Sequence, residues 1–248
     1  MTRNRSASVL EWDSEHWGIT IARVRDGAFT AALEDDLDGW VAGAGAELLS
    51  YLCDATDTSS LLRAQAAGFV VVDIRMELAL DIPSTSLPST NALGGCITEA
   101  DVACLPDLRA LASQLHTVTR FAVDPRLQPR AAALYERWIE RDVRAGELAL
   151  VATIDQEVVG YLTGGIDDGT GVISLVGVHP SARGRGAGSA LVERALEWFQ
   201  GQGAGRARVV TSAAAVEAQR IYHRAGFAPT TVGVWLHRWT TNVAFEDR

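Results

Sequence analysis

The sequence of 248 residues contains few cysteines and no long apolar run. Its three cysteines, Cys53, Cys96 and Cys104, are odd in number and lack metal-ligand spacing, which is typical of reduced structural thiols. No stretch approaches the roughly 18 apolar residues that a membrane helix needs, and residues 1–8 lack the apolar core of a signal peptide. We therefore expect a cytoplasmic protein without a metal site and without a membrane partner.

The sequence also lacks the excess of basic residues that marks a general nucleic-acid-binding protein. Its formal net charge is −9, whereas such proteins usually present a basic face. An acidic total still permits an anionic ligand, because local arginines and backbone amides determine where an anion binds. The length predicts one large domain or two small ones, with a core that needs no metal or disulfide. The sequence leaves open whether the protein forms a homodimer.

The clearest boundary in the chain is the segment 81–95, DIPSTSLPSTNALGG. Proline, serine, threonine and glycine dominate it, which is typical of a loop or linker. We predict an N-terminal domain over residues 1–80, a linker over 81–95 and a larger domain over 96–248.

A weak internal repeat connects the two regions. Residues Tyr51–Leu78 align without a gap on Val209–Leu236, so that Gly68-Phe69 falls on Gly226-Phe227. Either two β-α-β segments are similar by chance, or the N-terminal region is half of a duplicated fold. On the second interpretation, the N-terminal half lacks the glycine-rich loop of the C-terminal half.

The C-terminal region combines helical and strand patterns. Apolar residues between 130 and 144 recur at helical spacing, and three apolar, β-branched segments separated by polar turns then predict an antiparallel meander over 147–154, 157–165 and 172–178. The later segments predict, in order, helix, strand, helix and strand: 191–199, 207–212, 214–225 and 231–239. The whole indicates an α/β fold.

The most informative motif is Arg183-Gly184-Arg185-Gly186-Ala187-Gly188, followed by Ser189 and a helix. Its glycines allow the chain to curl so that unpaired amides at a helix N-terminus converge on an anion, and its arginines add positive charge. The Gly-Lys-Ser/Thr ending of a P-loop is absent, and so is the Gly-x-Gly-x-x-Gly of a dinucleotide fold. The loop predicts a pyrophosphate site, with a plain surface turn as the alternative.

This strand, loop and helix resemble the GNAT superfamily of acetyltransferases, whose hallmark is a strand, Arg/Gln-x-x-Gly-x-Gly/Ala, and a helix. The resemblance implies a mixed, largely antiparallel sheet with flanking helices, preceded here by a partial GNAT-like N-terminal region, and makes residues 96–248 the catalytic domain. It also implies acetyl-CoA as co-substrate, bound between the third and fourth C-terminal strands. The strand residues that would hold the pantetheine are Leu175, Val176, Gly177 and Val178.

The same resemblance assigns a general acid. Within VEAQRIYHRAGF, the matching residue is Tyr222, which would protonate the departing thiolate. Tyr222 also shares a helical face with apolar residues, so a core aromatic is the alternative. Relatives often carry asparagine where this chain has Ala215, so one coenzyme contact is expected to be absent. In the repeat, Ala64 stands at the position of Tyr222, so the N-terminal half is not expected to be catalytic.

The acceptor side of the reaction is less clear from the sequence. The strand 172–178 carries no carboxylate or histidine, which leaves water or a residue such as Asp155, Asp167 or His179 as the base. Thr119-Arg120-Phe121 and the N-terminal LEWDS segment resemble GNAT enzymes that acetylate the 4-amino group of dTDP-4-amino-4,6-dideoxygalactose.

That resemblance implies a small-molecule amine acceptor, in particular a nucleotide-linked amino sugar. Arg120 would then pair with a phosphate and Phe121 would pack on a sugar or base, unless Arg120 is a surface charge and Phe121 a core residue. Two other functions remain open. One is acetylation of a peptide N-terminus, an antibiotic or another small amine, and the other is a non-catalytic acyl-CoA sensor.

Overall fold

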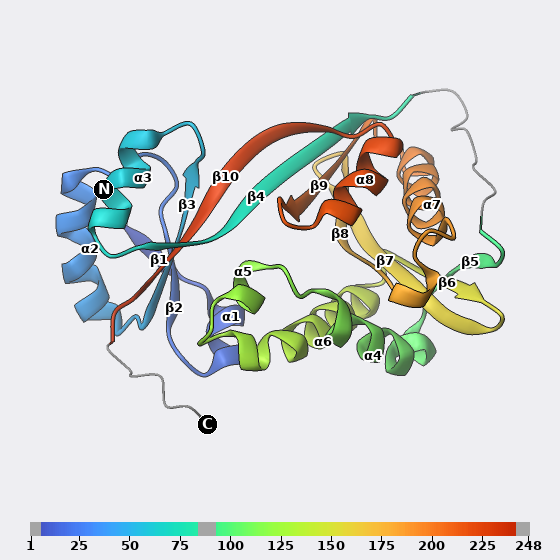
Figure 1. Cartoon of the computed structure of the whole chain (residues 1–248), viewed down its shortest axis with the longest axis horizontal. Helices are drawn as coiled ribbons and strands as arrows, with labels where there is room; N and C mark the ends of the chain where they lie inside the picture. The colour runs from blue at the N-terminus through green and yellow to red at the C-terminus, as the bar shows by residue number, and fades with distance from the viewer. Residues whose placement is uncertain (1–5, 84–92, 242–248) are drawn as a thin grey trace.

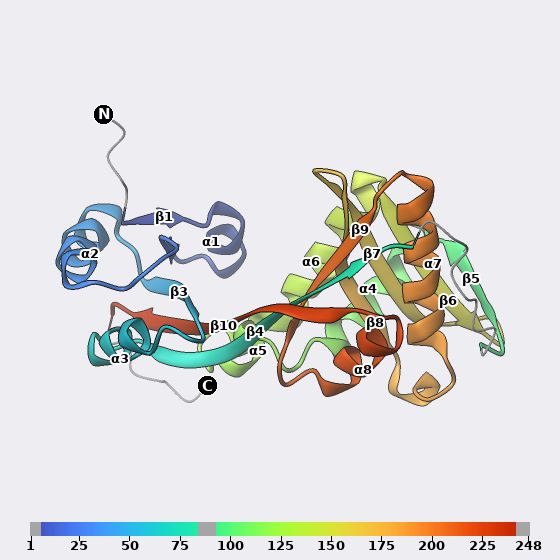
Figure 2. The ribbon, with the colours of Figure 1, turned by 90° about the horizontal axis from the view of Figure 1, so that it is seen from above.

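The computed structural model describes residues 6–83 and 93–241, so residues 84–92 of the predicted linker lie outside the described residues. In these two ranges, ten strands form one sheet in the order β1-β2-β3-β10-β4-β9-β8-β7-β6-β5. Helices cover the sheet (Figure 1, Figure 2). This mixed sheet with flanking helices confirms the predicted α/β fold class.

The elements have the following bounds. The strands are β1 (Ala7–Val9), β2 (Ile21–Val24), β3 (Leu48–Asp54), β4 (Val70–Asp81), β5 (Cys96–Glu99), β6 (Leu148–Ile154), β7 (Glu157–Asp167), β8 (Thr170–Val178), β9 (Arg206–Ser212) and β10 (Ala228–Trp239). The helices are α1 (Glu11–Trp17), α2 (Ala31–Ala44), α3 (Thr58–Ala66), α4 (Leu105–Leu115), α5 (Arg120–Val123), α6 (Gln128–Ala145), α7 (Ala187–Gly201) and α8 (Val216–Arg224). Two 3-10 turns are η1 (Val102–Cys104) and η2 (Pro180–Ala182).

Two long strands join the halves of the sheet. β10, at the end of the described chain, pairs antiparallel with β3 along Gly233–Trp239 and with β4 on its other side. β4, from the N-terminal half, pairs in turn with β9 along Arg75–Asp81. Figure 1 and Figure 2 both show β4 and β10 running together through the middle of the molecule. Each half therefore completes its sheet with a strand from the other half.

The element order agrees with the internal repeat. The units β3-α3-β4 and β9-α8-β10 share the order strand, helix, strand, and each helix is followed by a glycine with positive φ, Gly68 at 86° and Gly226 at 95°. In the sheet these strands lie in the order β3-β10-β4-β9, so the final strands of the two units are exchanged. The division into an N-terminal domain, a linker and a catalytic domain remains a prediction.

Buried side chains fill both faces of the sheet. In the C-terminal half, α7 and α8 pack on one face, and α4 and α6 on the other. In the N-terminal half, α2 and α3 cover one face, while α1, α5 and the first turns of α6 cover the other. α6 contributes to clusters in both halves and so spans the junction between them. Its C-terminus is set by Gly146, whose φ of 72° forms a left-handed cap.

A buried carboxylate fixes the corner between α5 and α6 to β10. Asp124 Oδ2 lies 2.7 Å from His237 Nδ1 and accepts from Trp239 Nε1 at 3.1 Å. Burial alone would raise the pKa of Asp124, but the hydrogen bonds from His237, the Arg126 amide and Trp239 hold it below the usual value. Burial lowers the pKa of His237 despite the neighbouring carboxylate. This corner places the N-terminus of α5 against β4 and β10.

Across the two described ranges, no helix is long and apolar enough to cross a bilayer.

If β10 belongs to the N-terminal core, a cavity in it should destabilise the fold. Leu236 on β10 is fully buried with Leu49 and Tyr51. We expect Leu236→Ala to lower the free energy of unfolding by about 2–5 kcal/mol, because buried methyl groups are lost and a cavity remains. Val232→Ala on the same strand, where the side chain is 39% exposed, should cost less than about 1 kcal/mol. Urea unfolding measures both, and equally small effects would contradict this role of β10.

Candidate active site

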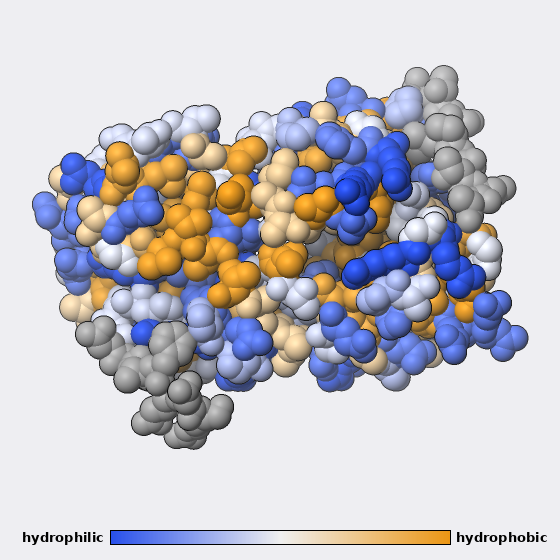
Figure 3. Space-filling model, viewed as in Figure 1, coloured by the Kyte–Doolittle hydropathy of each residue, from blue (hydrophilic) through white to orange (hydrophobic). Residues whose placement is uncertain are grey.

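β8 and β9 diverge toward the glycine-rich loop. They pair in parallel only over Thr170–Ile173 and Arg206–Val209. Beyond these residues, β8 continues along β7 as far as Val178, and β9 continues along β4 as far as Ser212. Backbone groups on the facing edges are therefore left for a ligand, because they have no strand partner there. The space-filling view shows a recess on this side, between the region of β9 and α8 above and the α5–α6 segment below (Figure 3).

A β-bulge changes the side-chain alternation of β8 where the gap opens. The register with β7 shifts between Ile173 and Leu175, which makes Ser174 the extra residue. Ile173 consequently packs in the α7 cluster, whereas Leu175 packs in the α4–α6 cluster. The segment Leu175–Val178, predicted to hold pantetheine, is the part of β8 that borders the gap.

The glycine-rich loop connects η2 to α7. Gly184 and Gly186 have φ angles of 75° and 85°, a region that favours glycine. A Cβ at Gly184 would meet no atom within 4 Å, so the space above the loop is open. Gly188 has another role, because a Cβ there would lie 2.5 Å from Ile221 Cδ1. Gly188 lets α7 approach α8, while the two preceding glycines shape the loop.

The donors at this loop suit a pyrophosphate. The first-turn amides of α7, from Ala187 to Ser189, have no carbonyl partner by helix geometry, and Ala190 is the first to bond back, to the Gly186 carbonyl at 3.0 Å. Arg183 and Arg185 are exposed, and neither forms an ion pair within the part of the chain that the structure describes. Unpaired amides and the positive end of the α7 dipole thus meet an open space, and two exposed arginines of the same loop add positive charge.

α8 carries Tyr222 into the core beside the gap. Its side chain is 2% exposed, and its ring meets Phe227 edge-on with 5.8 Å between centroids. Burial raises the pKa of Tyr222, so the phenol stays protonated and can donate. The hydroxyl makes no hydrogen bond to any residue in the described ranges. This environment fits an acid without a resting acceptor, and the burial also fits the core aromatic of the alternative interpretation.

Gln219 holds the turn between β9 and α8. Its Nε2 donates to the Ser212 carbonyl at 3.1 Å and to the Ala213 carbonyl at 2.8 Å. Ala215, the N-cap of α8, contributes no side-chain hydrogen bond. The position where relatives often have asparagine is therefore apolar, and a residue one turn later fixes the loop instead.

A histidine–tyrosine pair at the gap was not predicted from the sequence. His116 Nε2 lies 2.6 Å from Tyr161 Oη, and its ring stacks on Tyr135 with 4.1 Å between centroids. The Tyr161 ring covers Gly177 of β8, where a Cβ would lie 2.8 Å from Tyr161 Cε1. Burial lowers the pKa of His116 to about 4, so the imidazole is neutral near pH 7. No local pattern indicates this pair, because 45 residues separate its members.

The three residues that the sequence suggested as a general base are not part of this histidine–tyrosine pair. Asp155 occupies the turn between β6 and β7, with a φ of 50°. Asp167 forms an ion pair with Arg208 at the end of β8 where β8 and β9 are still paired. His179 follows β8 directly and hydrogen-bonds Ser181 at 2.7 Å, which places it beside the glycine-rich loop.

The structure gives Arg120 and Phe121 different surroundings. Phe121 is 5% exposed and stacks on Trp17 with 5.0 Å between centroids, which is the core position of the alternative interpretation. The Arg120 guanidinium lies over the rings of Phe121 and Trp235, 4.1 Å from each centroid. Burial lowers the pKa of Arg120 to about 10, so the group remains cationic at neutral pH. Arg120 is thus a stacked, half-buried cation at the junction of the two halves.

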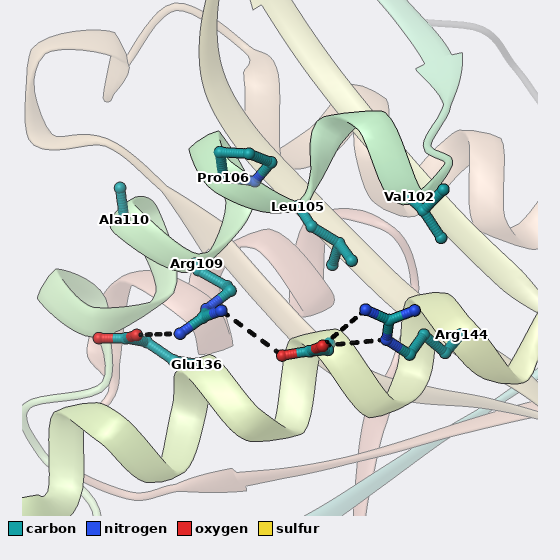
Figure 4. A pocket seen from close by; sticks show the side chains of 8 residues that line it. Val102, Leu105, Pro106, Arg109, Ala110, Glu136 and Arg144 are labelled. Carbon is teal, nitrogen blue, oxygen red and sulfur yellow. Dashed lines mark hydrogen bonds and ion pairs between the residues drawn. The ribbon is translucent and has the colours of Figure 1, made fainter.

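One groove of the molecule lies away from these residues. It has a volume of about 540 Å³ and lies along the outer sides of α4 and α6. Figure 4 shows its charges paired with one another: Arg109 bridges Glu136 and Glu140, and Arg144 meets Glu140 from the other side. The groove therefore has no free charge for a ligand and serves to hold α4 on α6.

The described ranges contain no group of three or more His, Cys, Asp or Glu residues that could hold a metal ion. Cys53 is buried, Cys104 is half-buried and Cys96 is exposed, and all three are free thiols.

Sequence comparison identifies the class of enzyme. Residues 105–227 match the model of the Acetyltransferase (GNAT) family. The matched segment contains the diverging strands, the glycine-rich loop and Tyr222. This segment is a GNAT acetyltransferase domain, and the protein is an acyl-CoA-dependent N-acetyltransferase.

Two relatives act on different acceptors. The dTDP-fucosamine acetyltransferase of Escherichia coli O6:H1 is 28% identical over 240 residues, which cover 94% of this chain and 98% of the relative. The mycothiol acetyltransferase of Stackebrandtia nassauensis is 30% identical over 125 residues, which cover 48% of this chain but only 37% of that protein. The first similarity spans nearly the whole chain, and the second is partial.

A solved structure shares the fold at low sequence identity. The GCN5-related N-acetyltransferase from Sphaerobacter thermophilus superposes with a TM-score of 0.66 at 18% identity, covering 94% of this chain and 76% of the other. At this identity the similarity shows the GNAT fold and does not define the acceptor.

The loop geometry predicts a binding defect when Gly184 gains a side chain. We expect Gly184→Ala to weaken acetyl-CoA binding about tenfold or more, because the methyl group is strained at positive φ and occupies the space where the anion would lie. Gly201→Ala, near the end of α7, where a Cβ meets no atom within 4 Å, should retain wild-type affinity. Isothermal titration with acetyl-CoA measures both constants, and equal affinities would argue against this loop as the pyrophosphate site.

Proposed function

We propose that the protein transfers the acetyl group of acetyl-CoA to the 4-amino group of a dTDP-linked amino-dideoxy sugar, with Tyr222 as general acid. The observation that carries the acyl-transfer part is the divergence of β8 and β9 beside a loop of unpaired amides. The proposal includes a cytoplasmic location, which the three free thiols support.

The residues fit the two ends of acetyl-CoA. Residues Gly184 to Ser189 would bind the pyrophosphate through the unpaired amides of the first turn of α7, with Arg183 and Arg185 adding charge. The free edge of Leu175–Val178 would hydrogen-bond the pantetheine and polarise the thioester carbonyl. Acetyl-CoA supplies the activated acyl group, and no metal enters the proposed reaction.

The proposed chemistry is direct transfer. The amine nitrogen forms a bond to the carbonyl carbon as the carbon–sulfur bond breaks, and Tyr222 gives its proton to the departing thiolate. The nitrogen loses one proton, which returns through water to the Tyr222 oxygen. The products are an N-acetyl amide and the thiol of CoA, so the enzyme ends in its starting protonation state.

The sugar part of the proposal has two supports. The similarity to the dTDP-fucosamine acetyltransferase covers nearly the full chain, including the N-terminal half. Arg120 also presents a cation at the junction of the halves, where it would contact a nucleotide phosphate, with Phe121 packed behind it. The partial similarity to a mycothiol acetyltransferase supports a second candidate, another small amine on the same scaffold. A non-catalytic acyl-CoA sensor would bind the coenzyme but release no thiol.

The proposed acid can be tested by removing one oxygen atom. We expect Tyr222→Phe to lower kcat by about 10²- to 10⁴-fold with little change in acetyl-CoA affinity, because the ring still packs while the proton donor is lost. Tyr51→Phe removes a hydroxyl that donates to the Gly27 carbonyl at 2.7 Å in the N-terminal half, and should leave kcat unchanged. Thiol release followed by a chromogenic disulfide gives both rates. Near-wild-type turnover in folded Tyr222→Phe would remove the acid assignment.

The acceptor can be tested with the wild-type protein. Thiol release from acetyl-CoA should depend on dTDP-4-amino-4,6-dideoxygalactose, and the sugar should gain the mass of one acetyl group. Release with other small amines but not with this sugar would favour the second candidate. Binding of acetyl-CoA without release, across amines, would favour the sensor.

A further inference from the structure

Three buried polar atoms within residues 6–83 and 93–241 lack a hydrogen-bond partner: Arg23 Nε, Ser50 Oγ and Thr119 Oγ1. Arg23 and Ser50 are register partners on β2 and β3, and Ser50 is only 3% exposed. Thr119 precedes α5, which packs against β4. Burial raises the pKa of Tyr135, and the nearby Thr119 hydroxyl partly offsets this rise. The Thr119 hydroxyl nevertheless forms no well-aligned hydrogen bond. Unpaired buried groups cost about 1–3 kcal/mol each, so a grouping of them on one side of the sheet requires an explanation.

A cation without an ion-pair partner lies beside these atoms. The Arg120 and Arg23 guanidinium groups approach the Trp235 ring to 4.1 Å and 4.5 Å from its centroid. Arg120 forms no ion pair or hydrogen bond through its side chain with the described residues, although the surrounding protein desolvates it. A desolvated cation without an anion is costly unless a bound group completes its coordination.

Two half-buried carboxylates face this cation. Asp13 on α1 makes no hydrogen bond, and burial raises its pKa. Arg120 is the charge that most opposes this rise, yet the two side chains are too far apart to form an ion pair. Asp73 on β4 accepts from Ser212 Oγ at 2.6 Å and is the register partner of Trp235. Burial raises the pKa of Asp73 as well. Carboxylates and a guanidinium thus share one site without neutralising each other directly.

We call Asp13, Arg23, Ser50, Asp73, Arg120 and Trp235 the central cluster. Its residues come from α1, β2, β3, β4, α5 and β10, so both halves of the chain contribute.

The central cluster lies at the open end of the gap. Asp73 is bonded to Ser212, the last residue of β9. On the other side, Trp12, next to Asp13 in α1, packs on Trp138, whose Nε1 donates to Ser174 in the bulge of β8 at 3.1 Å. The cluster therefore connects to both diverging strands.

We propose that the central cluster binds the acceptor, and that it selects an amine that also carries phosphate. Asp13 and Asp73 would hold the amine end near β8 and β9, while Arg120, backed by Arg23, would bind the phosphate through its planar fork. Ser50 supplies polar character behind the arginines. This inference rests on the proposed acetyl transfer to an amine and gives the N-terminal half a direct role in acceptor recognition.

Asp13→Asn is the sharpest test, because its structural and functional effects have opposite signs. Burial disfavours the charged form of the Asp13 side chain, which forms no hydrogen bond to the described residues. The neutral, isosteric variant should therefore melt at or above the wild-type temperature. Its kcat/KM for dTDP-4-amino-4,6-dideoxygalactose should nevertheless fall about 10- to 100-fold, with acetyl-CoA affinity unchanged. Asp36→Asn, at an exposed position of α2, is the matched control and should leave both quantities unchanged.

The phosphate part is tested by equilibrium titration with dTDP, which has no amine. Arg120→Gln should weaken dTDP binding about 10- to 100-fold, whereas Asp13→Asn should not weaken it. Arg63→Gln, which removes an exposed ion pair with Glu34 on α3, is the control. If Arg120→Gln does not fold, Arg23→Gln replaces it, and the same direction is expected.

The outcomes separate this inference from the proposed function. Acetylation of the sugar with wild-type kinetics in folded Asp13→Asn and Arg120→Gln would overturn the central cluster as acceptor site and leave the function standing. Arg120-dependent binding of dTDP, without acetylation of the sugar, would support the cluster and remove the sugar from the function. Failure of the wild-type protein to bind either dTDP or the sugar would overturn the inference, and the cluster would then hold water only.

Discussion

The divergence of β8 and β9 is the constraint on which the site depends. Each strand is held by its other neighbour, β8 by β7 and β9 by β4, so neither can close toward the other. The bulge at Ser174 then gives β8 a free edge at the position where the loop and Tyr222 come together. The proposed coenzyme side of the site is therefore made of backbone, because backbone groups without a partner are what the gap provides.

The N-terminal half has a structural reason to be present. It lacks a glycine-rich loop, and Ala64, at the repeat position of Tyr222, is fully buried. Yet β4 from this half is the strand that holds β9 in place, and β10 from the other half lies between β3 and β4. The N-terminal half therefore fixes the geometry of the strands that diverge in the C-terminal half. The polar residues of the central cluster give the same half a chemical role in the inference above.

Local signals predicted the parts of the fold that local chemistry determines. The antiparallel meander, the helix over 130–144 and the loop from Arg183 to Ser189 follow from side-chain period and from glycine, which act over a few residues. The exchange of β4 and β10 could not be predicted, because periodicity shows that a strand is buried but not which strand it pairs with.

The same limit applies to the site. Tyr222 and the loop lie in one recognisable segment, whereas the contact between His116 and Tyr161 depends on the glycine at 177 that lets the ring cross β8. Likewise, the sequence marks Arg120 as a charge, but its stacking on Trp235 and its unpaired state arise only when β10 comes to lie beside β4. Residues that are brought together by strand exchange leave no pattern along the chain.

The position of β10 also shapes how the molecule is made. β3 and β4 are synthesised early, but the strand that belongs between them is near the end of the chain, so their edges stay open until residues 228–239 emerge from the ribosome. Pairings of such long sequence separation form slowly, and open strand edges are prone to join other chains. Neither half can mature as an independent unit during translation. A chain that stops before β10 carries two incomplete sheets, each with an edge ready to pair with the wrong partner.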